Sequence, residues 1–203
     1  MGLACCHSLS CVEARPRPDA GCWLRPEIAA CHSADPFALG PCQRLARLSG
    51  LPEWVTPQEH QFIRPGGQGQ FGKSFSGIRY EEHGFEGGPY LGFPTSHDVY
   101  GDGSIVVVPA PGHTPGGVII FVTLAIGTRY AFVGDLVWQL EGITLREERP
   151  WITRRGSDSD VEGNRENLLR MIALKERLPE SIIVPAHDMR PFAEMPALNS
   201  GKQ

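Results

Sequence analysis

Long apolar segments and dense positive charge are both missing from this sequence of 203 residues. The longest apolar stretch, Val118 to Ile126, is nine residues long, whereas a membrane-spanning helix needs about twenty. Lys and Arg number 19 against 23 Asp and Glu, for a net charge of −4, and they form no basic tract. These absences predict a soluble protein with no membrane and no nucleic-acid partner.

Cysteine is absent after residue 42, and the first 42 residues hold all six. They form no Cys-x-x-Cys pair of the kind that marks a structural zinc site, and the start of the chain does not resemble a secretory signal peptide. We therefore expect a cytoplasmic protein with an anomalous Cys-, Pro- and Arg-rich segment at 1–50 and a globular domain at 51–203. A genuine redox or zinc appendage is the alternative for the first segment. The cysteines are Cys5, Cys6, Cys11, Cys22, Cys31 and Cys42.

The pattern of apolar residues changes from Leu51 onward and predicts an α/β fold. Continuous β-branched or apolar runs predict strands at 104–109, 118–124, 129–133 and 181–184. The spacing of apolar residues between 160 and 177 predicts an amphipathic helix, which Pro179 would end.

Three predicted strands are each followed by a potential metal ligand, namely His113, Asp135 or His187. Alone, each could be an ordinary loop histidine or a Gly-Asp turn. Imidazole and carboxylate together suit Zn²⁺, and loops at strand ends can bring distant segments together. In this order, the three residues predict a metal site.

The segments Pro111–Gly116, Val133–Asp135 and Ile183–His187 resemble the later metal-binding motifs of the metallo-β-lactamase superfamily, in particular its acyl-homoserine lactonase-like hydrolases. The resemblance implies an αββα sandwich, here with its N-terminal part incomplete. It also implies that His113 binds a first zinc ion, His187 binds a second, and Asp135 bridges them.

Such a relative would hydrolyse a small-molecule ester, lactone or thioester through a hydroxide held between two metals. Asp135 would then have a catalytic role because it fixes the metal spacing. We expect Thr114 or backbone carbonyls to orient the histidines. Trp138 and Trp151 could line a substrate pocket or belong to the core.

The family's leading motif, His-x-His-x-Asp-His, which supplies four further ligands, is absent from the sequence. The residues Asp35–Arg44 stand in its place. They can be encoded by codons that, read one base later, give Thr-His-Ser-His-Trp-Asp-His-Val-Ser. Arg outnumbers Lys 16 to 3, as GC-rich coding would give. We therefore hypothesise that about residues 21–50 are a frameshifted translation.

The absence of these four ligands leaves a second interpretation open. The chain as written could be a catalytically inactive, incomplete remnant of the fold. The sequence does not fix its oligomeric state.

Overall fold

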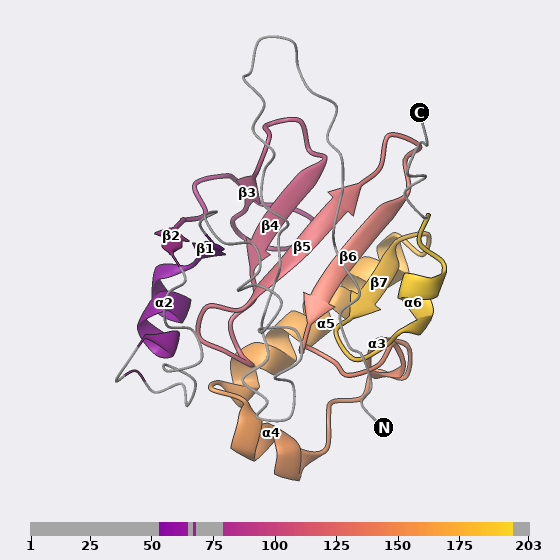
Figure 1. The fold of residues 1–203 in the computed structure, drawn as a ribbon. Coiled ribbons are helices and arrows are strands. Elements are labelled where there is room, and N and C mark those ends of the chain that lie inside the picture. The colour runs from indigo at the N-terminus through magenta and orange to yellow at the C-terminus, as the bar shows by residue number, and fades with distance from the viewer. Residues whose placement is uncertain (1–52, 65–66, 68–78, 197–203) are drawn as a thin grey trace, which may run out of the picture.

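The computed structural model describes residues 53–64, 67 and 79–196. Its centre is a five-stranded sheet in the order β3-β4-β5-β6-β7 (Figure 1). All neighbouring strands are antiparallel except β6 and β7, which are parallel. The strands are β3 His97–Asp98, β4 Ile105–Pro109, β5 Val118–Thr123, β6 Arg129–Gly134 and β7 Ile182–Pro185.

Both faces of this sheet are buried, which is why its strands are continuous apolar runs rather than alternating ones. Successive residues of β4 point to opposite faces, so Val106 and Val108 belong to one apolar cluster and Ile105 and Val107 to another. The long strands therefore begin and end within one residue of the predicted positions.

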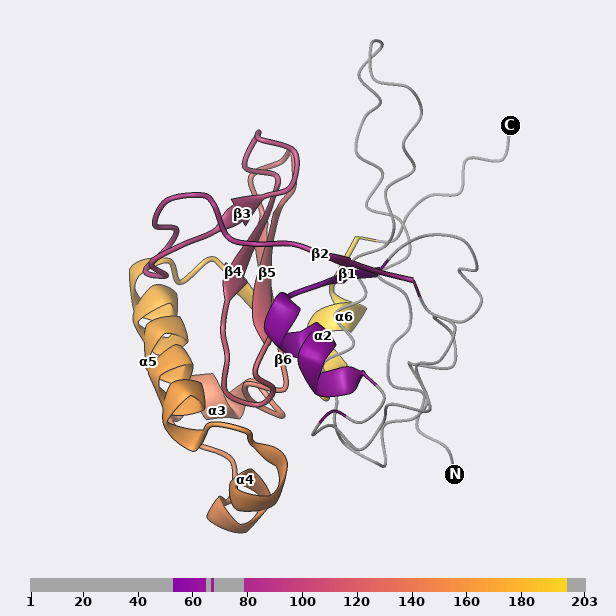
Figure 2. The ribbon, with the colours of Figure 1, turned by 90° about the vertical axis from the view of Figure 1, so that its left-hand side faces the viewer.

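Helix α5, Val161–Arg177, covers the face that carries Val106 and Val108 (Figure 2). The side chain of Asp160 accepts hydrogen bonds from the backbone N–H groups of Glu162 and Gly163 and so caps the start of the helix. Leu168, Met171, Ile172 and Leu174 are buried against the sheet. The predicted helix is thus confirmed, with Pro179 two residues beyond its end.

Smaller elements lie on the other side of the sheet (Figure 2). They are the parallel strands β1, Glu53–Val55, and β2, Tyr80–Glu82, with the helices α2, Pro57–Ile63, and α6, Arg190–Ala193. The order helix, large sheet, second sheet is that of the expected αββα sandwich with an incomplete N-terminal part. The predicted segment 1–50 lies outside the described residues.

Two short helices, α3, Glu141–Thr144, and α4, Trp151–Ser157, connect β6 to α5. Among the described residues, no helix is long and apolar enough to cross a membrane.

Candidate metal centre

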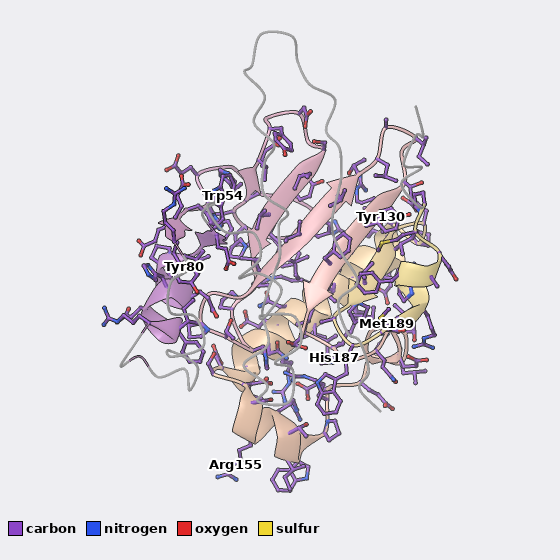
Figure 3. All side chains as sticks on the ribbon, in the orientation of Figure 1. Trp54, Tyr80, Tyr130, Arg155, His187 and Met189 are labelled. Atoms are coloured by element: carbon purple, nitrogen blue, oxygen red, sulfur yellow. The ribbon has the colours of Figure 1, made fainter. Side chains whose placement is uncertain are left out.

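Strand direction brings the three predicted ligands to one edge of the sheet. Because β5 is antiparallel to both β4 and β6, and β7 is parallel to β6, the strands β4, β6 and β7 all end at the same edge. Asp135 directly follows β6, His187 is two residues beyond β7, and His113 is four residues beyond β4. Figure 3 shows His187 at this edge, near the ends of β6 and β7.

The carboxylate of Asp135 lies between the two histidines. Its Oδ1 is 2.8 Å from His187 Nε2, and its Oδ2 is 3.6 Å from His113 Nε2. The side chains of Asp135 and His113 are only 3% and 9% exposed, whereas that of His187 is 29% exposed. The cluster is therefore buried on the Asp135 side and reaches solvent at His187.

Three buried polar atoms of this cluster have no hydrogen-bond partner, namely His113 Nε2 and both carboxylate oxygens of Asp135. Neither contact with Asp135 has the geometry of a hydrogen bond. Buried polar atoms are almost always paired, so this exception needs an explanation. Imidazole nitrogen and carboxylate oxygen are ordinary ligands of Zn²⁺, and the atoms left without partners are those that would bind it.

The cluster supplies only part of a coordination sphere. Its side chains meet in pairs through Asp135. Among the residues that the structure describes, no group of three or more His, Cys, Asp or Glu side chains is arranged to hold a metal ion as it stands.

The loop that carries His113 is held from one side by the start of α2. The buried side chain of Glu59 accepts a hydrogen bond from Gly116 N at 3.0 Å, and Thr56 Oγ1 donates one to Gly116 O at 3.3 Å. Gly116 allows this close approach, because a Cβ there would lie 2.0 Å from Thr56 Oγ1.

The segment before α5 holds the same loop from the other side. The backbone N–H of Ser159 donates to His113 O at 3.1 Å, and that of Asp160 donates to Gly112 O at 2.8 Å. Farther along, Asn167 Nδ2 donates to Pro111 O at 2.7 Å. The main chain on both sides of His113 is thus fixed before any ligand binds.

The ring of His113 has a partner that sequence analysis missed. His113 Nδ1 lies 3.0 Å from Asp158 Oδ1, and Asp158 is in turn paired with Arg149. The expectation that Thr114 or a carbonyl orients this ring is wrong, since Thr114 Oγ1 has no hydrogen-bond partner. Asp158 is 45 residues from His113, and no motif marks it.

Trp138 and Trp151 are not core residues. Their exposed fractions are 38% and 66%, which excludes the alternative that they fill the interior. The guanidinium carbon of Arg149 lies 5.9 Å from the centre of the Trp138 ring. Trp138 thus lies beside the charged pair that contacts His113.

The residue after His187 ties together the segments that follow β6 and β7. The buried carboxylate of Asp188 accepts hydrogen bonds from Leu140 N at 3.1 Å and from Arg190 Nε at 2.8 Å. The Arg190 guanidinium, together with the backbone N–H groups of Leu140 and Arg190, lowers the pKa of Asp188 from 3.8 to about 2, against the opposing effect of burial. Asp188 therefore stays charged at neutral pH.

The fold and the cluster together define an α/β protein with a candidate metal centre at one sheet edge. A sequence model of the metallo-beta-lactamase superfamily matches residues 43–187, which is most of the chain. The chain belongs to the metallo-beta-lactamase superfamily. The comparison with curated proteins finds no match.

Several solved structures share the fold. One is an N-acyl homoserine lactone hydrolase with N-hexanoyl-L-homoserine bound at its catalytic metal centre, with 16% identity and a TM-score of 0.53 over 79% of this chain and 55% of that one. A mutant of AiiA from B. thuringiensis with bound N-decanoyl-L-homoserine gives the same four values. A quorum-quenching N-acyl homoserine lactone lactonase also has 16% identity and a TM-score of 0.53, over 79% of this chain and 57% of its own. The chain thus spans about half the length of these proteins, and the likeness concerns the fold.

Proposed function

We propose that this chain derives from a metal-dependent hydrolase of a small-molecule ester, lactone or thioester, and that His113, Asp135 and His187 are metal ligands. The observation that carries the proposal is the set of buried atoms without a hydrogen-bond partner, His113 Nε2 and both Asp135 oxygens, which lie between the two histidines where three strands end. The structural likeness to proteins that hold acyl-homoserines supports a lactone as the first substrate to test.

Zinc would supply a water of lowered pKa and would polarise the substrate carbonyl. His113 and His187 would each hold an ion through Nε2, and Asp135 would share its carboxylate between them. The buried side of the cluster excludes water around Asp135, which strengthens its attraction to a cation. The more exposed His187 lies on the side from which a substrate would enter.

The missing leading motif is the second part of the proposal. We infer that residues from about 21 to 50 are a frameshifted translation and that 51–203 is the hydrolase domain. The match to the family model begins at residue 43 and so leaves out most of Asp35–Arg44, the residues that stand where the leading motif would be. The chain as written then lacks four ligands of a two-metal site.

An inactive remnant is the second candidate function. The absence of the leading His-x-His-x-Asp-His motif from the sequence favours it for the chain as written. A site with three ligands for two ions leaves each ion under-coordinated, and hydroxide formation needs a complete site. The two candidates thus describe one chain before and after repair of its reading frame.

The deciding experiment compares the 203-residue chain with a version whose frame is restored across residues 35–44. We expect the unrepaired chain to bind zinc weakly and to show little or no hydrolysis of N-hexanoyl-homoserine lactone. The repaired chain should bind two zinc ions and turn over the lactone, and His113→Ala in it should abolish turnover.

The measurements are zinc content after dialysis and lactone hydrolysis followed by proton release. Robust zinc-dependent turnover by the unrepaired chain would show that the site is misplaced. If the repaired chain binds two zinc ions but cleaves no ester, lactone or thioester, the proposed activity is wrong.

A further inference from the structure

Asp158 and Arg149 form a buried charged pair directly behind His113. The Asp158 side chain is fully buried and that of Arg149 is 4% exposed. Removing two charges from water can cost more free energy than their mutual attraction returns, so stabilisation alone does not explain this pair. A role in orienting its neighbour explains its position better.

The hydrogen-bond chemistry of Asp158 fixes the state of the His113 ring. A carboxylate can only accept, so the Nδ1 atom 3.0 Å from Asp158 Oδ1 must carry the hydrogen. The lone pair of neutral His113 is then on Nε2, which faces Asp135 Oδ2 at 3.6 Å. Two acceptors facing each other in a buried site favour a cation between them.

Arg149 holds Asp158 in turn. Its guanidinium pairs with Asp158 Oδ1, and Ser157 Oγ lies 3.4 Å from the same oxygen. Asp158 also directly precedes the Ser159 N–H that binds His113 O. One segment, residues 158–159, thus supplies both the carboxylate at the His113 ring and the N–H group bound to the His113 main chain.

We propose that Asp158, held by Arg149, is a positioning residue that keeps the hydrogen of His113 on Nδ1 and aims Nε2 at the metal. This inference rests on the proposed function for its metal. Its effect on the ring, however, can be measured in the metal-free protein.

The test uses the 203-residue chain and Asp158→Asn. In the metal-free chain at pH 8, ring ¹⁵N shifts should show His113 with its hydrogen on Nδ1. In Asp158→Asn the Nε2–H form should become populated, because an amide can also donate to Nδ1. Zinc affinity, measured by competition with a chelating dye, should fall about 10- to 100-fold.

Two further variants keep this test decisive. Asp158→Asn alone leaves the charge of Arg149 buried without a counter-charge. The double variant Asp158→Asn with Arg149→Gln removes both charges, and we expect from it the same change in His113 tautomer and zinc affinity. Asp102→Asn removes one carboxylate from an exposed turn, where Asp102 Oδ1 accepts a hydrogen bond from the nearby Ser104 N at 2.9 Å, and should change neither readout.

The outcomes separate the two proposals. An unchanged His113 tautomer together with unchanged zinc affinity in both Asp158 variants overturns the positioning role. Absence of zinc binding by the parent chain, with the tautomer shift still present, counts against the metal site and leaves the positioning role standing.

Discussion

Replacing Asp188 by Asn should destabilise the protein in a pH-dependent way. The native pKa of about 2 lies below the ordinary 3.8, a difference worth at most about 2.4 kcal/mol by linkage. Because Arg190 is 59% exposed, solvent screening reduces this to about 1–2 kcal/mol. We expect Asp188→Asn to lose this amount at pH 7.

The direction of the pH dependence follows from the sign of the shift. A lowered native pKa stabilises the folded state above pH 3.8, and this stabilisation is lost as the pH falls through about 2. The difference in unfolding free energy between the parent and Asp188→Asn should therefore shrink between pH 5 and pH 2. Urea unfolding followed by circular dichroism at several pH values measures it.

The control for this prediction is Asp102→Asn, in an exposed turn. It should leave the unfolding free energy within about 0.5 kcal/mol of the parent. A difference for Asp188→Asn that stays constant down to pH 2 would refute the reasoning, because the lost stability would then not come from the charge.

Two further predictions concern packing. Gly116→Ala places a Cβ 2.0 Å from Thr56 Oγ1 and should lower the free energy of unfolding in urea by about 1–3 kcal/mol. Its control, Gly156→Ala, meets nothing within 4 Å and should be neutral or slightly stabilising. Equal effects of the two variants would contradict the close approach at Gly116. Leu174→Ala, at a fully buried position of α5, should lower the free energy of unfolding by about 2–5 kcal/mol. Leu169→Ala, at a position that is 57% exposed, should change it little. A small loss of stability in Leu174→Ala would mean that α5 is loosely packed.

The large sheet was predictable because its strands are buried on both faces. The buried stretches of these strands, such as 105–108 and 131–133, are apolar throughout, a pattern that needs no knowledge of their partners. The short strand β3, His97–Asp98, has no such run, because its place depends on pairing with Val106 and Val107.

The meeting of His113, Asp135 and His187 was predictable for a similar reason, since each follows a strand and strand ends share an edge. The contact of His113 with Asp158 was not, because it depends on how the segment before α5 packs against the loop. Trp138 and Trp151 show the same limit. A tryptophan side chain suits a core or a pocket equally well, and only the fold shows that both of these are exposed.

Among the residues that the structure describes, the contacts that hold the cluster all come from the part of the chain after the substituted motif. His113 is held by Gly116 and Ser159, Asp135 by the end of β6, and His187 by the end of β7 next to Asp188. All of these contacts lie between residues 56 and 188. A frameshift across Asp35–Arg44 would thus remove ligands while leaving the supporting contacts of the other three in place. For this reason, restoring the reading frame of the segment that includes Asp35–Arg44 should recover zinc stoichiometry and turnover together, whereas a defect in the scaffold would require changes elsewhere in the chain.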